Sequence, residues 1–285
     1  MLSLSQKMGT MVTQKAERRR TLGQTDARLL TTLSSQGQNI FTTQDAASVL
    51  GCSSAAVRKR LHRLVKKGWL RRLEKGKYLI LPLSAGPAGE YVPDEFVIAA
   101  HLIEPYYISY WSALRYYGYS EQAAPIVYIV TTRRKRPLTV GGITYRFVTV
   151  RAHKFFGARR VWSGAEAIQM AEREKALVDS LDRPDLCGGV IEAAKAIWRG
   201  REEMDWEKVV AYGRRMGNRT ILKRLGFLLE TFALGTLPLL DALQADVGAG
   251  YTVLDNLYPR EGRRDHRWHL VVNVPEHELL NWRER

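Results

Sequence analysis

The sequence predicts an α+β protein with two domains, and three features indicate this class. Residues 25–81 hold three helical patterns followed by two short β-rich runs. Gly86-Pro87-Ala88-Gly89 then interrupts regular structure, so we expect residues 82–93 to form a linker. From Asp94 onward β-rich runs come early and helical patterns late, which favours a mixed α/β second domain over residues 94–285. A chain of 285 residues is long enough for both.

The first domain is expected over residues 21–81. Leu29, Leu30 and Leu33 mark its first helix, Thr25–Ser35. A second helix is expected over Asp45–Leu50 and a third over Ser54–Lys67, with the turn Gly51-Cys52-Ser53 between them.

The turn has the chemistry of a helix-turn-helix motif. Gly51 takes positive φ without steric cost, and a serine side chain can cap the next helix by accepting a backbone N–H. Ala47, four residues before Gly51, is a small residue where the two helices would cross. We expect Cys52 in this turn to be a small buried thiol.

The third helix has an apolar side and a basic side. Val57, Leu61 and Leu64 stand at i, i+4 and i+7, so they form one packing stripe. After Gly68, Trp69–Leu73 and Tyr78–Leu81 indicate two strands around a turn at Glu74–Lys77. A helix-turn-helix followed by a hairpin is typical of a winged helix-turn-helix domain.

We expect this domain to bind double-stranded DNA. The helix start would contact phosphate, the exposed helix face would read bases in the major groove, and the hairpin lysines would contact the backbone. A solvated basic helix beside an ordinary hairpin is the alternative. The candidate DNA-binding residues are Ser53, Ser54, Arg58, Lys59, His62, Arg63, Lys66, Lys75 and Lys77.

The charge distribution supports a polyanionic partner for the first domain. The whole chain carries a net charge of +15, from 44 Lys+Arg and 29 Asp+Glu. Residues 1–81 hold 16 basic and 4 acidic residues, a net +12, against 28 and 25, a net +3, in residues 82–285. Residues 1–20 end in Arg18-Arg19-Arg20 and suggest a flexible basic arm, which either follows DNA or is an uninvolved tail.

Cysteine content and hydropathy indicate a cytoplasmic protein. Cys52 and Cys187 provide neither a disulfide framework nor the spacing of a zinc site. The sequence shows no secretion signal and no apolar stretch long enough to cross a bilayer, so we expect no membrane partner.

In the second domain, Asp94 is expected to cap a helix to about Glu104, and Ser109 a helix that ends before Gly118. Tyr110, Trp111, Leu114 and Tyr117 on the latter helix fit a core better than a base-stacking surface. Strands are expected at Tyr106–Ile108, at Ile126–Thr132 and in a hairpin around Gly141-Gly142. The pattern turns helical from Ser163, and a last strand is expected at His269–Val274.

A cationic run, Arg133-Arg134-Lys135-Arg136, precedes Pro137. It is a possible second basic patch for phosphate or an acidic partner, and a solvated loop is the alternative.

Several segments behind the first domain resemble the AbiEi antitoxin family of abortive-infection toxin–antitoxin systems. They are Tyr106–Gly118, Val127–Arg134, Arg146–Val148 with Phe155–Gly157, and Glu174–Pro184 with Gly188-Gly189. The resemblance covers roughly residues 25–235 and leaves residues 236–285 without a role. It implies an antitoxin that represses its own operon at promoter repeats, acts in phage defence, and counteracts a nucleotidyltransferase-like toxin, with or without direct contact.

The sequence offers weak support for an enzyme. Glu172, Glu174, Lys175 and Asp179 could suggest a metal-dependent nuclease, but ion pairs on a helix surface explain them, because adjacent helical residues diverge. Asp265, His266 and His269 lie in a segment that leads from a loop into a strand. Positions three apart face opposite sides of a strand, so the two histidines would not converge, and no third ligand is apparent. We therefore expect no enzyme, no cofactor and no metal site. The alternative function is a stand-alone, ligand-responsive transcription factor whose second domain senses a ligand or dimerises.

Overall fold

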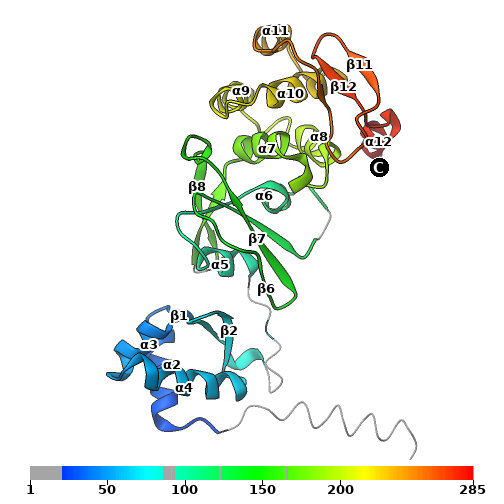
Figure 1. Cartoon of the computed structure of the whole chain (residues 1–285). Helices are drawn as coiled ribbons and strands as arrows, with labels where there is room; N and C mark the ends of the chain where they lie inside the picture. Colours follow the sequence, from blue (N-terminus) through cyan, green and yellow to red (C-terminus); the bar gives the residue numbers. More distant parts are fainter. Residues whose placement is uncertain (1–20, 86–90, 92–93, 122–123, 165, 285) are drawn as a thin grey trace, which may run out of the picture. The chain divides into compact units, whose positions relative to one another are not determined.

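The protein is described by a computed structural model covering residues 21–85, 91, 94–121, 124–164 and 166–284 (Figure 1). The predicted arm, residues 1–20, and residues 86–90 and 92–93 of the predicted linker lie outside the described residues. The chain divides into two compact units, Met1–Pro93 and Asp94–Arg285. Both combine helices with sheets, so the fold is mixed α+β.

The first unit has three helices and a three-stranded antiparallel sheet of order β1-β3-β2. The sequence patterns predict all of these except β1, which is short and gains its regularity from pairing with β3. The elements are α2 (Gln24–Ser35), β1 (Ile40–Thr42), α3 (Thr43–Leu50), α4 (Ser54–Lys66), β2 (Leu70–Glu74), β3 (Lys77–Ile80) and the 3₁₀ turn η1 (Leu83–Ala85).

One apolar core joins these elements. Leu29 and Leu33 of α2 meet Leu61 and Leu64 of α4, and all four side chains are fully buried. Phe41 of β1 adds a ring that stacks on Tyr78 of β3, with centroids 6.0 Å apart. Burying a leucine side chain contributes roughly 1.5–3 kcal/mol, so this cluster determines how α4 is seated.

The second unit is built on a six-stranded mixed sheet of order β6-β7-β5-β4-β9-β8. As predicted, residues from Ile126 form a strand, β5, and Gly141-Gly142 is a two-residue hairpin turn, with φ of 59° and 84°. β5 lies in the interior of the sheet, between β7 and β4. The strands are β4 (Tyr107–Ile108), β5 (Ile126–Thr131), β6 (Leu138–Val140), β7 (Ile143–Thr149), β8 (Ala158–Ser163) and β9 (Glu166–Ala171).

The prediction that the chain turns helical from Ser163 is wrong. Residues 166–171 form β9, which pairs with β8 and β4. Ile168 and Met170 are fully buried on alternate positions, the period of a strand. Glutamate, glutamine and methionine favour helices, so composition conceals a strand that its sheet neighbours impose.

Helices pack around α7 (Arg173–Asp182), which contacts α6, α8, α9 and α10. Every residue from Glu174 to Leu181 is buried, so α7 is the central helix of the unit. Figure 1 shows α8 to α11 gathered on the α7 side of this unit, away from α5 and β6. The other helices of the unit are α5 (Glu95–Ala100), α6 (Tyr110–Tyr116), α8 (Val190–Arg199), α9 (Trp206–Arg215), α10 (Arg219–Thr231) and α11 (Leu237–Ala245), with 3₁₀ turns η2 (Ala152–Lys154) and η3 (Pro184–Leu186).

The helix starts differ in part from the sequence prediction. Asp94 caps α5 by accepting the Phe96 N–H at 2.7 Å, as expected, but the helix ends at Ala100 rather than Glu104. Ser109 does not cap α6, because its hydroxyl donates instead to Asp179 at 2.7 Å. Of the aromatic residues of α6, Tyr110 is buried and Trp111 is half-buried, which supports the predicted core role.

Residues 236–285 belong to the body of the second unit. β10 (Thr252–Val253), β12 (Leu270–Val272) and β11 (Arg263–Asp265) form a small sheet, followed by α12 (Glu276–Leu280) and η4 (Asn281–Glu284). Asp255 accepts the Val190 N–H at 2.6 Å at the start of α8, and Trp268 packs without exposure against Gly226. The tail therefore completes this core. The predicted strand at His269–Val274 is shorter than expected.

The prediction of surface ion pairs is wrong for Lys175 and Asp179. Lys175 and Asp179 are fully buried and form an ion pair with each other. The hydroxyls of Ser109 and Tyr107 donate to the second Asp179 oxygen, at 2.7 and 3.3 Å. Burial raises the pKa of the Asp179 carboxyl, and Lys175 opposes that rise. The pair lies at the junction of β4, α6 and α7.

Removing one partner leaves the other charged and buried, which costs about 3–5 kcal/mol. We expect Lys175→Met to lower the free energy of unfolding of the second unit by that amount. Arg183→Met is the control, because its pair with Asp185 is half exposed and contributes about 0–1 kcal/mol. Urea unfolding followed by tryptophan fluorescence measures both losses. Six of the seven tryptophans follow residue 94, so the signal reports mainly on the second unit. Equal, small losses would contradict the role of the buried pair.

Candidate nucleic-acid interface

A defined turn sets α4 against α3. Thr42 and Asp45 form a capping box at the start of α3, with Thr42 N donating to the Asp45 carboxylate at 2.7 Å. Gly51 ends α3 in the left-handed region, at φ 62°, as predicted. Ser53 then caps α4 by accepting the Ala56 N–H at 3.4 Å. Both helix ends at the turn are thereby fixed.

Ala47 is partly buried against the core, next to the fully buried Ala46. One predicted detail of the turn is wrong. Cys52 is exposed rather than buried, since the tight turn projects it outward. The buried thiol is Cys187 of the second unit, and burial raises its pKa.

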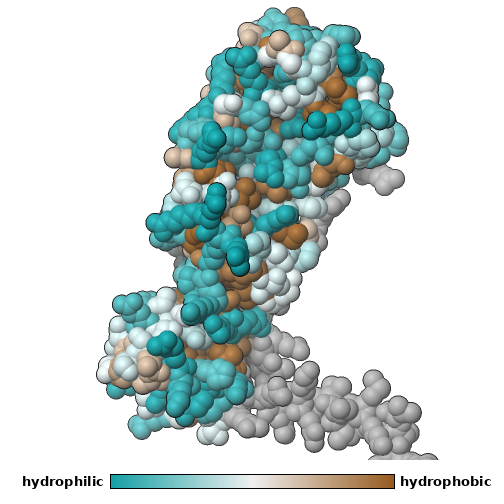
Figure 2. Space-filling view, in the orientation of Figure 1, coloured by the Kyte–Doolittle hydropathy of each residue, from teal (hydrophilic) through white to brown (hydrophobic). Residues whose placement is uncertain are grey.

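The two sides of α4 are chemically opposite. Val57, Leu61 and Leu64 have no exposed surface. The helical period therefore turns the residues between them to solvent, and all of the polar candidates on α4 are exposed: Ser54, Arg58, Lys59, His62, Arg63 and Lys66. Ser53 in the turn is exposed as well. Figure 2 shows hydrophilic side chains gathered over this part of the first unit.

Two further cations of the α4 region hold the helix in place. Arg60 donates to Asp26 of α2 at 2.6 Å, and Lys67 donates to the Thr21 carbonyl at 3.0 Å. Arg58 bends back along α4 to donate to the Ser54 carbonyl at 3.1 Å. The charge that remains outward is therefore concentrated on Lys59, Arg63 and Lys66.

The hairpin turn is shorter than predicted. β2 runs to Glu74 and β3 starts at Lys77, so Lys75 and Gly76 alone form the turn, with Gly76 at φ 79°. Lys75 is exposed at the tip. Lys77 lies in β3 and pairs with Glu74 at 3.2 Å, so part of its charge is already neutralised.

Arg72, exposed on β2, is a further basic residue of the hairpin that the sequence pattern did not indicate. It donates to the Glu74 carbonyl at 3.2 Å and thus lies near the turn. Strict alternation from the buried Leu70 would turn Arg72 inward, but the register shifts between Arg72 and Glu74, so Leu73 is buried and Arg72 faces solvent. The hairpin therefore carries a cation besides Lys75.

This arrangement suits a polyanion with a groove. Guanidinium and ammonium groups bind phosphate oxygens, and the same groups on an exposed helix reach base edges in a major groove about 12 Å wide. The opposite face of α4 carries the apolar stripe, which is buried in the core. The nine predicted residues thus lie on three neighbouring features of one unit: the turn, the outward face of α4 and the hairpin.

The cationic run of the second unit lies in the loop between β5 and β6. Arg133, Arg134 and Arg136 are exposed. Lys135 is partly buried, donates to the Leu102 carbonyl and lies over the Phe147 ring at 5.2 Å. Three of the four predicted cations therefore face solvent, and the fourth anchors the loop.

The acidic and histidine clusters show no metal-like convergence. Glu172 and Glu174 pair with Lys208 of α9, at 3.1 and 3.2 Å. His266 contacts the Tyr251 hydroxyl, and His269 the Gly248 carbonyl. Within the described ranges, no group of three His, Cys, Asp or Glu side chains could hold a metal ion. None of the described helices is long and apolar enough to cross a bilayer.

The fold has a solved counterpart. The crystal structure of the RV2827C protein from Mycobacterium tuberculosis is similar over 95% of this chain and 98% of that chain, with a TM-score of 0.68 and 17% sequence identity. At that identity the likeness concerns the fold. No curated protein matches the sequence significantly.

A family model describes the first unit. Residues 28–80, from α2 through β3, match the model of transcriptional regulators of the AbiEi antitoxin type. The match includes the turn, all of α4 and the hairpin, and it agrees with the family resemblance found in the sequence. Residues 28–80 are therefore similar to the domain of AbiEi antitoxin transcriptional regulators.

Proposed function

We propose that the protein is a transcriptional repressor that binds its own promoter DNA through a winged helix-turn-helix domain and serves as antitoxin of an abortive-infection operon. The observation that carries the proposal is α4, whose apolar stripe is fully buried while its basic side chains Arg58, Lys59, His62, Arg63 and Lys66 are exposed. The family match at residues 28–80 supports the regulator role.

In the proposed complex, α4 enters the major groove of double-stranded DNA, at promoter repeats. Ser53, Ser54 and the helix start contact phosphate, because the first N–H groups of a helix attract anions. Lys59, His62 and Arg63 face base edges, and Lys66 and the hairpin lysine Lys75 hold the backbone. Arg58 and Lys77 have intramolecular partners and contribute less.

The antitoxin part of the proposal rests on the AbiEi match and on the second unit's own folded core. The functional partner would be a nucleotidyltransferase-like toxin encoded beside this gene, in a phage-defence system of the cytoplasm. The second unit would act by binding rather than by catalysis. Its acidic side chains support this, since each of Glu172, Glu174 and Asp179 already has a cationic partner.

Base contacts and phosphate contacts should respond differently to mutation. We expect Arg63→Ala to weaken binding to the promoter fragment about 5- to 150-fold, equivalent to about 1–3 kcal/mol, and to leave binding to random DNA nearly unchanged. Lys75→Ala should weaken both alike, because phosphates carry no sequence. Competition titrations with promoter and random duplexes measure this, and Arg28→Ala on the exposed side of α2 is the control. Equal losses on both duplexes for Arg63→Ala and Lys75→Ala would contradict the assignment.

The antitoxin role is testable by growth rescue. The adjacent gene is expressed under control, and this chain is supplied from an unrelated promoter, either unchanged or with Lys59→Ala and Arg63→Ala together. We expect growth arrest by the adjacent gene and equal rescue by both chains, because repression is not needed in this setting. An adjacent gene without toxicity would contradict the antitoxin proposal and leave the DNA-binding proposal standing.

The stand-alone, ligand-responsive regulator is the second candidate function. A specific observation favours it, namely a pocket in the second unit lined by aromatic and polar side chains.

A further inference from the structure

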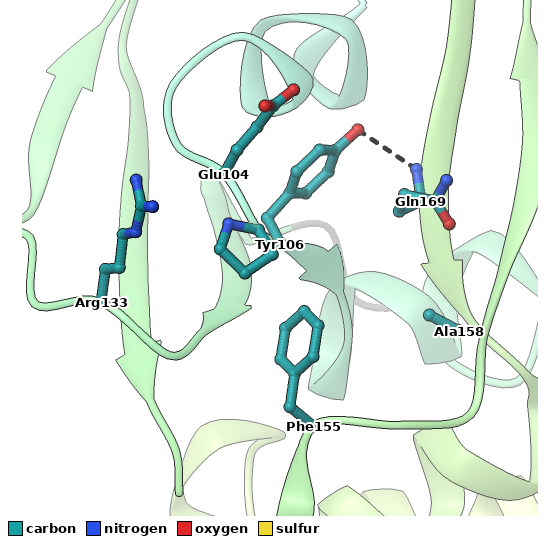
Figure 3. Close-up of a pocket in the computed structure, with 7 residues that line it drawn as sticks. Glu104, Tyr106, Arg133, Phe155, Ala158 and Gln169 are labelled. Carbon is teal, nitrogen blue, oxygen red and sulfur yellow. Dashed lines mark hydrogen bonds between the residues drawn. The ribbon is translucent and has the colours of Figure 1, made fainter. Parts of the chain in front are cut away.

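The second unit contains a pocket of about 550 Å³ between the segment before β4, the loop after β5 and the start of β8. Figure 3 shows Arg133 on one side and Gln169 and Ala158 on the other, with Tyr106 and Phe155 between them. Its size lies within the range of small-molecule sites, roughly 300–1,000 Å³. It is far in sequence from the DNA-binding candidates.

The pocket wall is aromatic and fixed. The Tyr106 hydroxyl accepts the Gln169 backbone N–H at 3.2 Å, and burial raises the pKa of this phenol, which stays protonated. The Phe155 ring packs against the buried Tyr107 ring, with centroids 5.1 Å apart. Flat faces held in this way suit a planar ring ligand, since stacking needs no rearrangement of the wall.

Polar groups at the pocket have unused binding capacity. Among the described residues, the Arg133 guanidinium, the Gln169 side-chain amide and the Glu104 carboxylate have no hydrogen-bond partner or ion pair. The amide offers two donors and an acceptor, as needed to read the edge of a base. The carboxylate can accept from hydroxyl or amino groups.

The loop that carries Arg133 is held in place. Thr149 donates to the Arg133 carbonyl at 3.3 Å, and the Arg133 N–H donates to Thr131 at 3.2 Å. Two residues further on, the Lys135 ammonium donates to the Leu102 carbonyl. Arg134 and Arg136 extend the positive charge outward from the pocket. The backbone at Arg133 is therefore fixed, so its guanidinium stays within reach of an anion attached to a ring in the pocket.

We propose that this pocket binds a nucleoside phosphate, with the base against Phe155 and Tyr106, its edge at Gln169, and the phosphates at Arg133. The ligand is either a free nucleotide or a nucleotide of a single strand, because both offer the same chemistry. Phosphates lie on the Arg133 side, away from the Glu104 carboxylate, which faces ribose hydroxyls. The proposal goes beyond promoter binding, and its failure would leave that function untouched.

Calorimetric titration of the full chain tests the site with three probes: ribonucleoside triphosphates, the matching nucleosides and tripolyphosphate. We expect Arg133→Gln to weaken triphosphate binding roughly tenfold with nucleoside binding unchanged, because only the phosphate contact is lost. Phe155→Leu should weaken triphosphate and nucleoside roughly tenfold and leave tripolyphosphate unchanged, because stacking is lost.

Matched controls separate this site from the rest of the chain. Arg134→Gln removes the neighbouring cation, which does not line the pocket, and should have a much smaller effect than Arg133→Gln. The double variant Lys59→Ala, Arg63→Ala should bind nucleotides normally. Ala158→Trp fills the pocket from an exposed position and should abolish binding without disturbing the core. It tests the site even if the Phe155→Leu variant does not fold.

Three results would overturn the proposal. They are the absence of binding of any nucleotide at millimolar concentration, equal losses from Arg133→Gln and Arg134→Gln, and nucleotide binding that Ala158→Trp leaves unchanged. A single-stranded trinucleotide, titrated beside the mononucleotide, identifies the source of the ligand. Tighter binding of the trinucleotide with the same dependence on Arg133 supports a strand, and equal or weaker binding supports a free nucleotide.

Discussion

The rotation of α4 about its own axis is the constraint on which the proposed interface depends. Three residues at i, i+4 and i+7, Val57, Leu61 and Leu64, are buried without exposed surface, and their burial stabilises one rotation only. Turning the helix by a quarter would expose leucines and bury lysine or arginine. The basic face is therefore a consequence of the core. The Arg60–Asp26 pair and the Ser53 cap fix the same rotation from the side and from the start.

A different constraint organises the second unit. The buried Lys175–Asp179 pair connects α7 to β4 and to the start of α6, because Tyr107 and Ser109 both donate to Asp179. Lys175 also lies over the Tyr107 ring at 5.5 Å. Tyr107 in turn packs on Phe155, a wall of the pocket. The ion pair thus fixes how α7 packs against β4 and α6 more specifically than apolar contacts alone would. Phe155 packs on Tyr107 of β4, so the same contacts hold the pocket wall in place.

Local physics explains which parts of this molecule the sequence could predict. Four predicted features depend only on residues that are close together in the sequence, so pattern and propensity suffice to predict them. They are the turn at Gly51, the Ser53 cap, the stripe of α4 and the hairpin around Gly141-Gly142. The basic face followed from the stripe for the same reason. These elements also contain most of the candidate DNA-binding residues.

Other features depend on residues far apart in the sequence and could not be predicted in this way. Residues 166–171 have the composition of a helix and become a strand only between β4 and β8. Lys175 looks like a surface lysine until β4 and Phe156 cover it. The pocket joins Tyr106, Arg133, Phe155 and Gln169, which no spacing relates. The hairpin turn is two residues shorter than predicted, so Lys77 lies in β3, where it pairs with Glu74 and its charge is partly neutralised.

The most direct test of the account is the salt dependence of binding between the full chain and a duplex from upstream of its own gene. Neutralising phosphates releases counterions, so about 6–10 phosphate contacts predict a fall in affinity of roughly 10³–10⁵ between 50 and 200 mM salt. We expect a linear plot of log affinity against log salt with a steep negative slope. A slope near zero would contradict DNA binding through the basic face of α4.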